Sequence, residues 1–301
     1  MSTSSQRFTC LSLALLLFSM LACSGERRQR RGEPTEAFTF AHDGAERTYT
    51  FYKPEGLKSG APLLVALHGG GGDASKAQGY YGFNPVAKKQ GFAVVYPEGV
   101  ENGWNDGRGD AKQIAARANY DDVGFINALV DALIEEHDLD EGRVYLTGAS
   151  NGGMMSVRLI CEHGDRYTAA APVIGGIPVM LEEKCKARAP RPIIIFKGTE
   201  DPLVPYQGGG VVNDERGEVM STEDEVSLWL ESAGWEIVDR RRKTKLGEID
   251  LVARKDGLIA FVEVKWRRSV PDLDLAIDER RLSRVAAAVG AVAHEYATGG
   301  E

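Results

Sequence analysis

The chain has 301 residues, of which 43% are hydrophobic and 27% are charged, and it is long enough for one large or two modest domains. Its net charge of −8 excludes a protein that binds nucleic acid with its whole surface. Residues 229–301 carry as many basic as acidic side chains, so the rest of the chain holds all the negative charge. This asymmetry is a first sign of two parts with different origins.

The N-terminus reads as a targeting segment. Arg7 precedes an apolar run over residues 11–22, which is too short to span a bilayer and is typical of a signal-peptide core. Small residues then lead into Cys23, as in a bacterial lipobox, so residues 1–23 are expected to be a lipoprotein signal peptide with Cys23 as the lipidated residue. An ordinary signal peptide with an incidental cysteine is the alternative. Residues 24–36 are polar and Arg-rich, which predicts a tether. We therefore expect an exported protein, lipid-anchored in the bacterial envelope or secreted.

Export permits disulfide bonds. If Cys10 leaves with the signal peptide and Cys23 is lipidated, Cys161 and Cys185 remain. A bridge between them would close a loop of about 25 residues and stabilise the protein by about 3 kcal/mol. We expect this bridge rather than two buried free thiols.

The elements that follow alternate between strands and helices. Residues 37–52 alternate in polarity around a His-Asp-Gly turn and predict a β-hairpin. Continuous apolar runs at residues 62–67 and 92–96 predict strands buried on both faces. Residues 121–137 have helical spacing. Further strands are predicted over residues 143–147, 167–173 and 192–196, and a helix over residues 152–162. Such alternation indicates an α/β fold with a parallel central sheet and helices on both faces.

A nucleophile motif occupies one of these junctions. Residues 148–152 read Gly-Ala-Ser-Asn-Gly and match G-x-S-x-G between a predicted strand and a predicted helix. A sharp turn there strains the serine backbone and lifts the Ser150 hydroxyl above the sheet edge. The pattern alone also occurs in glycine-rich turns, so its place in the chain carries the prediction that Ser150 is a nucleophile.

A glycine-rich loop follows the strand over residues 62–67. Glycines after His68 allow backbone N–H groups to turn toward a developing oxyanion, which predicts Gly69 and Gly70 as donors, together with the N–H of Asn151. A flexible surface loop is the alternative. His68 itself is expected to shape the loop rather than to act as a base.

An acid is predicted after the strand over residues 192–196. In a serine hydrolase a carboxylate orients the catalytic histidine and stabilises its charged form. Asp201 is the candidate for this role, and Glu200 is the neighbouring alternative.

These motifs together carry a family resemblance. The stretches LLVALHGGGGDA, GWNDG, DDVGFINALVDAL, RVYLTGASNGGMM and GTEDPLVPY resemble the polyhydroxybutyrate depolymerase and feruloyl esterase group of secreted hydrolases, over residues 36–230. The resemblance implies an α/β-hydrolase that acts on small-molecule or polymeric esters without a cofactor, with Ser150 and Asp201 in its triad. It also implies the pairing of Cys161 with Cys185. Lys197 departs from the group, which usually has histidine there.

The catalytic histidine of that group has no counterpart. The group carries it several tens of residues after the acid, in a glycine-rich segment, whereas the only histidine after Asp201 is His294. His294 lies in an alanine-rich helical stretch, where a structural role is expected. We therefore predict an α/β-hydrolase domain over residues 37–228 that is C-terminally incomplete and has an impaired triad.

A second signature replaces the missing segment. Residues 246–253 and 258–264 predict a hairpin that turns at Asp-Gly. Asp250, Glu263 and Lys265 match the D…E-x-K pattern of restriction-endonuclease-like folds. The two carboxylates could hold Mg²⁺ beside a phosphate, and the lysine could orient the attacking water.

The surrounding sequence also resembles a family. SLWLESAGWEIVDRRRKTKLGEIDLVARKDGLIAFVEVKWRRS is similar to the YraN-like family of that fold, and in its register Glu223 takes the place of a helix acidic residue. Basic residues over 240–245 would then face a phosphate backbone, although a solvated basic strand is the alternative. We predict that residues 229–301 are a small α/β restriction-endonuclease-like segment, itself incomplete, joined by gene fusion, frameshift or splicing.

Three functions follow from these motifs. The first is an exported serine ester hydrolase that contacts the membrane through a lipid anchor. The second is a metal-dependent nuclease or nucleic-acid-binding protein that acts through the C-terminal segment. The third is an anchored binding protein without catalysis. The ester is not specified, because substrate choice lies in loops over the site.

Overall fold

The computed structural model describes residues 36–186, 191–245, 247–256, 258–262 and a few positions between 288 and 295, all within one unit over residues 32–301. Predictions for Cys23, Glu263, Lys265 and His294 lie outside the described residues, as does the side chain of Asp250. Within the described ranges, no helix has the length and apolar character needed to cross a membrane.

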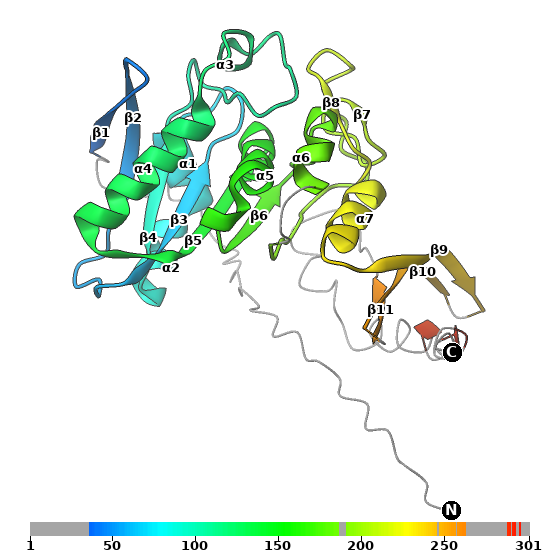
Figure 1. The fold of residues 1–301 in the computed structure, drawn as a ribbon. Helices are drawn as coiled ribbons and strands as arrows, with labels where there is room; N and C mark the ends of the chain where they lie inside the picture. The colour runs from blue at the N-terminus through cyan, green and yellow to red at the C-terminus, as the bar shows by residue number, and fades with distance from the viewer. Residues whose placement is uncertain are drawn as a thin grey trace, which may run out of the picture. The chain divides into compact units, whose positions relative to one another are not determined.

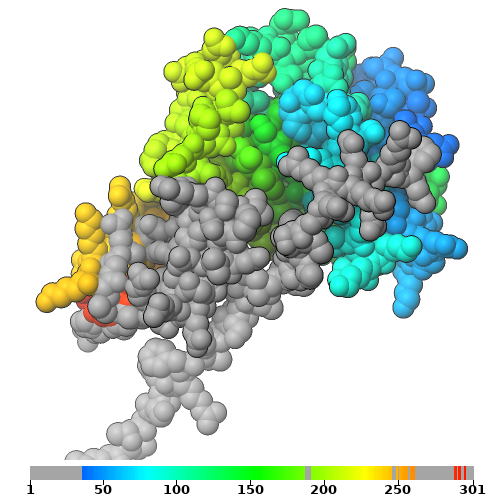
Figure 2. Space-filling view, turned by 180° about the vertical axis from the view of Figure 1, so that it is seen from behind, coloured from blue at the N-terminus to red at the C-terminus, as the bar shows by residue number. Residues whose placement is uncertain are grey.

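A six-stranded mixed sheet forms the centre of the larger part of the chain, which comprises the described residues up to Ser232 (Figure 1). Its spatial order is β1 (Ala37–His42), β2 (Ala45–Tyr52), β4 (Ala93–Pro97), β3 (Ala61–Leu67), β5 (Leu139–Ala149) and β6 (Ala169–Val173). The β1–β2 and β2–β4 pairs are antiparallel, whereas β4, β3, β5 and β6 run parallel. From behind, the blue hairpin and the cyan segment that follows it lie next to each other (Figure 2). The predicted α/β class and hairpin are confirmed.

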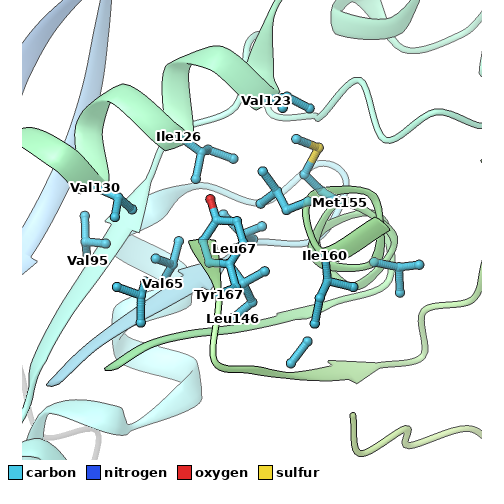
Figure 3. Close-up of a cluster of buried hydrophobic side chains, with 14 of the residues drawn as sticks. Val65, Leu67, Val95, Val123, Ile126, Val130, Leu146, Met155, Ile160 and Tyr167 are labelled. Carbon is cyan, nitrogen blue, oxygen red and sulfur yellow. The ribbon is translucent and has the colours of Figure 1, made fainter. Parts of the chain in front are cut away.

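Helices cover both faces of this sheet. Helices α1 (Ala74–Tyr81) and α2 (Phe83–Gln90) pack on one face, and α4 (Asp122–His137) and α5 (Asn151–His163) pack on the other. The remaining helices are α3 (Ile114–Arg117), α6 (Glu182–Lys186) and α7 (Thr222–Ser232), with 3₁₀ turns at Gly164–Arg166 and Val179–Leu181. Val65 and Leu67 pack in one cluster with residues of α4 and α5 (Figure 3), while Ala66 and Val94 pack in another with residues of α1 and α2. This double burial explains why the central strands are continuous apolar runs.

The long helix α4 follows its predicted range closely. The Asp121 side chain caps its start by accepting the Gly124 N–H at 2.8 Å, which satisfies a donor that the helix leaves free. Its end is fixed by Asp138, which adopts a left-handed conformation with φ of 52°. The cap residues therefore explain both boundaries.

The strand predicted over residues 192–196 is only partly realised. This segment runs parallel to β6 through isolated bridges at Ile193 and Phe196 rather than a continuous ladder. The N–H of Ile194 donates to Ala170 O at 3.0 Å, and the N–H of Phe196 donates to Pro172 O at 3.1 Å. Pro172 has no N–H to return to Ile194, so the ladder is interrupted there.

Helix α7 belongs to the hydrophobic core of the larger part. Leu228 is buried in the same cluster as residues of β3 and α5, and Trp229 packs partly against it. The domain boundary predicted between residues 228 and 229 therefore falls inside a packed helix.

A separate three-stranded antiparallel sheet follows α7. It contains β11 (Leu258–Val262), β10 (Gly247–Lys255) and β9 (Glu236–Thr244) in that order. Strands β10 and β11 form the predicted hairpin. Ile249 and Val252 pack with Ala288 and Val292 in a small core of their own. A two-stranded ribbon, β7 (Gly209–Gly210) with β8 (Glu218–Val219), precedes α7, and Val219 packs with Met154 of α5.

Candidate active site

Ser150 occupies a strained turn between β5 and α5. Its φ of 53° and ψ of −118° lie in a region that non-glycine residues avoid, at a cost of about 1–3 kcal/mol. The Ser150 N–H donates to Val173 O at 2.8 Å, and its carbonyl oxygen accepts the Met154 N–H at 2.9 Å. The neighbouring strand and the helix therefore hold the turn from both sides.

The glycines around Ser150 are required by close packing. A Cβ at Gly148 would come within 2.8 Å of Leu67 O, and one at Gly153 would come within 2.9 Å of Val173 O. A Cβ at Gly152 would lie 2.7 Å from the carbonyl carbon of Leu67. Real side chains do not tolerate such contacts with backbone atoms, so only glycine fits at these positions. We call this closely packed turn at residues 148–153 the elbow.

The glycine-rich loop stands over this elbow. A Cβ placed on Gly69 would lie 3.8 Å from Ser150 Cβ, and one on Gly70 would lie 3.6 Å from Asn151 Cβ. Gly71 and Gly72 donate their N–H groups to Asn102 O and Gly69 O. In the part of the chain that the structure describes, the N–H groups of Gly70 and Asn151 have no acceptor, so both remain available to an oxyanion.

The side chain of Asn151 fixes the start of α5. Its Oδ1 accepts the Trp104 N–H at 2.8 Å, while Nδ2 donates to Trp104 O at 3.1 Å and to Asp106 Oδ2 at 2.6 Å. All three residues are buried. The sequence motif GWNDG indicated this stretch, but its role beneath the elbow was not predicted.

Asp106 continues the buried network. Its Oδ2 accepts the Arg108 Nε–H at 2.8 Å, and Arg108 also donates to Arg216 O at 3.2 Å. Burial raises the pKa of Asp106, although the Arg108 charge and the Asn151 hydrogen bond act in the opposite direction. The network thus connects Asn151, through Asp106 and Arg108, to the loop that follows β7.

A second buried carboxylate secures the same stretch. Asp122 accepts the Asn105 N–H at 2.7 Å through Oδ2 and an Arg47 N–H at 2.7 Å through Oδ1. Burial raises the pKa of Asp122, while the Asn105 hydrogen bond and the Arg47 charge lower it. Strand β2 and helix α4 thereby hold residues 104–106 in place.

His68 shapes the loop, as expected. It is 1% exposed, its Nε2 accepts the Gly99 N–H at 2.9 Å, and its Nδ1–H donates to Gly69 O at 2.9 Å. Its ring lies 4.8 Å from the Trp104 ring, whose Nε1–H donates to His68 O at 2.8 Å. Both ring nitrogens are engaged, so His68 has a structural role in the glycine-rich loop.

The other described histidines have different surroundings. His42 lies 3.3 Å from Asp121, His137 stacks on Phe51 at 4.7 Å, and His163 ends α5. Among the described residues no histidine hydrogen-bonds to Ser150. The described part of the site thus brings the predicted nucleophile Ser150 close to the predicted oxyanion donors, and it includes no histidine hydrogen-bonded to Ser150.

Asp201 lies in the loop after the segment beside β6, where the acid was predicted. Its Oδ1 accepts the N–H groups of Leu203 at 2.8 Å and Val204 at 3.0 Å. The carboxylate therefore organises a turn, and its role in a triad stays a prediction. The alternative, Glu200, is exposed.

Lys197, the position that departs from the resembling group, is buried against α7. Its Nζ donates to Glu225 Oε2 at 2.5 Å. Burial raises the pKa of Glu225, although the Lys197 charge and hydrogen bond lower it. A buried ion pair thus takes the place expected for histidine.

Cys161 and Cys185 form a disulfide that joins α5 to α6, which is the expected pairing. Glu162 lies beside it and accepts hydrogen bonds from Arg158 at 3.1 Å and Lys184 at 2.7 Å. Burial acts to raise the pKa of Glu162, but these two partners outweigh it and lower the pKa.

The C-terminal metal prediction is not tested by the described side chains. Glu223 lies in the first turn of α7, and its carbonyl oxygen accepts the Ser227 hydroxyl at 2.7 Å. Over the ranges that the structure describes, no group of three or more His, Cys, Asp or Glu residues is arranged to hold a metal. A site formed with Asp250, Glu263 and Lys265 stays a prediction.

Two family models match separate parts of the chain. Residues 47–187 match the family described as Esterase PHB depolymerase, and residues 222–296 match Uncharacterised protein family UPF0102. Both resemblances seen in the sequence are therefore confirmed.

Individual relatives divide in the same way. The putative esterase NocK of Nocardia uniformis subsp. tsuyamanensis is 35% identical over 187 residues, which cover 61% of this chain and 53% of NocK. A UPF0102 protein of Erythrobacter litoralis (strain HTCC2594) is 60% identical over 79 residues, which cover 26% of this chain and 68% of the relative. The match to NocK spans only about half of that relative.

A solved structure supports the fold. The acetyl xylan esterase from Aspergillus awamori superposes with a TM-score of 0.54 at 16% identity, covering 80% of this chain and 97% of that chain. At this identity the likeness concerns the fold alone, and it agrees with the α/β-hydrolase architecture.

Proposed function

We propose that this chain, which belongs to the UPF0102 family over residues 222–296, is a serine ester hydrolase with Ser150 as nucleophile, because residues 47–187 match the Esterase PHB depolymerase family. The observation that carries this proposal is the approach of the oxyanion loop to the elbow, with the Gly69 Cβ position 3.8 Å from Ser150 Cβ. Nucleophile and oxyanion donors must meet at this range to act on one carbonyl group.

The chemistry follows from the atoms at the elbow. The Ser150 hydroxyl oxygen would attack the ester carbonyl carbon, and the N–H groups of Gly70 and Asn151 would stabilise the negative oxygen that forms. Collapse of that intermediate expels the alcohol and leaves an acyl group on Ser150, which water then removes. The reaction requires a proton acceptor for the hydroxyl, which the described histidines do not provide.

The proposal therefore includes slow turnover. Serine hydrolases that lack a triad member keep roughly 10³–10⁴-fold acceleration over water, because the oxyanion hole and substrate binding still act. We propose that Asp201 is the acid of a triad whose histidine base is missing. Asp201→Asn should therefore leave the slow rate nearly unchanged, and a large fall in the rate would show that a base is present.

Hydrolysis of p-nitrophenyl acetate and butyrate by the purified protein tests the nucleophile. Ser150→Ala should abolish the protein-dependent rate, whereas Ser75→Ala, a matched change at an exposed position of α1, should leave it unchanged. A rate that survives Ser150→Ala would contradict the proposal.

We also propose that the protein is exported and anchored through a lipid on Cys23. The support is the apolar run and the small residues before that cysteine in the sequence. Cys23→Ser should move the protein from the membrane fraction to the soluble fraction and prevent labelling by a radioactive fatty acid. Unchanged fractionation and labelling of the variant would reject lipidation at this residue.

A second candidate function is nucleic-acid binding by the UPF0102 part, with Mg²⁺-dependent cleavage as its catalytic form. The observation that favours it is β9 and its end, where Arg240, Arg241, Lys243 and Lys245 are all exposed. Binding to a fluorescent DNA duplex should weaken steeply as salt increases. Absence of binding at low salt would remove this candidate, and Asp250→Ala would test whether any Mg²⁺-dependent cleavage belongs to the chain.

A further inference from the structure

The side chain of Gln113 lies beside the oxyanion loop. A Cβ added to Gly70 would be 3.0 Å from Gln113 Nε2 and 3.6 Å from Asn151 Cβ. A Cβ added to Gly103 would be 2.7 Å from Gln113 Cδ and would collide with Oε1. Two glycines therefore form the surface on which the Gln113 carboxamide rests, and one of them is a proposed oxyanion residue.

The neighbouring polar side chains are already engaged. The Asn151 amide is bonded to Trp104 and Asp106, and the adjacent Lys112 is paired with Glu215. Within the described residues the Gln113 side chain itself has no hydrogen-bond partner, although it is only partly exposed. A carboxamide offers two donor hydrogens and one acceptor oxygen, and none of these is committed to a described protein group, so all are open to water or to a ligand.

The carboxamide suits one kind of ligand group. It is neutral, donates and accepts, and is matched by a hydroxyl group, which also donates and accepts. The Gln113 carboxamide is therefore free to pair with a hydroxyl group of a ligand bound beside Gly70.

We propose that Gln113 is a specificity-determining residue that hydrogen-bonds to a hydroxyl group of the ester substrate close to the reacting carbonyl. This inference rests on the proposed ester site at Ser150. The hydroxyl can belong to the acyl part or to the alcohol part of the ester, and the two sources differ in which substrates Gln113 favours.

Binding to the full-length Ser150→Ala protein tests the proposal without requiring turnover. Ligand-observed NMR titrations would compare methyl 3-hydroxybutyrate with methyl butyrate for the acyl part. They would compare 2-hydroxyethyl butyrate with propyl butyrate for the alcohol part. In one of these pairs the hydroxylated ester should bind about 5-fold more tightly, which corresponds to one neutral hydrogen bond.

Gln113→Met in the same background should remove that preference while leaving affinity for the plain ester unchanged, because methionine keeps the length of the side chain. Gly103→Ala should have the same effect, because its Cβ would displace the carboxamide. Gln90→Met, a matched change at the exposed end of α2, should preserve the preference.

Two results would overturn the inference: no preference for either hydroxylated ester in the Ser150→Ala protein, or a preference that persists in Gln113→Met. An equal loss of affinity for both members of a pair would also overturn it, since that result indicates a packing role. If the preference depends on Gln113 in the Ser150→Ala protein but the protein with Ser150 intact shows no measurable hydrolysis, this inference would be supported and the proposed hydrolysis rejected.

Discussion

Lys197 Nζ lies 2.5 Å from Glu225 Oε2, and the two side chains are 4% and 0% exposed. The pair connects the segment beside β6 to helix α7, in which the UPF0102 match begins. Leu228, on the same helix, is buried in the core that β3 and α5 also form. The start of the UPF0102 match therefore packs against the esterase-like part of the chain and is not joined to it by a free linker.

Lys197→Met should destabilise the protein by about 3–5 kcal/mol at neutral pH, because it leaves the Glu225 carboxylate buried without its partner. Urea unfolding followed by circular dichroism would measure the loss. The double variant Lys197→Met/Glu225→Leu should recover much of it, since no buried charge remains.

The loss should also depend on pH. The folded-state pKa of Glu225 is raised, so its contribution is fully present below the unfolded value of about 4.3 and is lost as pH rises through the folded value. Without Lys197 the pKa rises further, so the variant should lie closer to wild type at pH 4 than at pH 7. Equal losses at both values would argue against an uncompensated charge.

Asn151→Asp should destabilise the protein by about 3 kcal/mol or more, because it sets a second carboxylate 2.6 Å from buried Asp106. The Ser150-dependent rate should fall as well, since the start of α5 loses its anchor. Thermal unfolding and p-nitrophenyl ester hydrolysis would report the two effects. Asn84→Asp is the matched control, because Asn84 Oδ1 only accepts the Tyr96 hydroxyl and an aspartate can do the same.

Glu162→Gln should lower stability by about 1 kcal/mol at pH 7, because it removes the charge that Arg158 and Lys184 stabilise. The folded-state pKa of Glu162 is lowered, so its contribution is present above the unfolded value and is lost as pH falls through the folded value. The two proteins should therefore converge under acid conditions. Urea unfolding between pH 7 and pH 3 would follow the convergence, and a constant difference would contradict it.

Replacing both Cys161 and Cys185 with serine should cost about 3 kcal/mol, because the bridge closes a loop with a sequence separation of 24. The disulfide holds α6 against α5, so the reduced wild type should match the double variant in chemical unfolding. A reduced protein as stable as the oxidised one would show that the pairing adds nothing to the native state.

The order of strands and helices was readable from local pattern. Val65, Leu67 and Val95 lie in runs with no polar face, and such runs are typical of strands with helices on both sides. The edge segment was less predictable, because the missing N–H of Pro172 interrupts a ladder whose partner, Ile194, lies 22 residues further along the sequence. The local sequence pattern does not reveal which distant carbonyl group will lack a hydrogen bond because its partner is a proline.

The site also contains residues that the sequence predicts and contacts that it does not. Ser150 and Gly69 could be proposed from the sequence because each lies in a motif whose meaning depends on adjacent residues. The bonds from Asn151 to Trp104 and Asp106 join residues more than 40 positions apart, so no spacing rule predicts them. Gln113 carries no motif at all, and only the folded chain brings it to Gly70.

The backbone conformation of Ser150 lowers the folding stability at the position where the proposed chemistry needs a hydroxyl group. Serine and alanine both hold a Cβ against the left-handed conformation, whereas glycine adopts it freely. Ser150→Gly should therefore melt at a higher temperature than Ser150→Ala, although neither variant can attack an ester. Under the proposed function, the stability lost to serine at this position is what it takes to place a hydroxyl group at the turn.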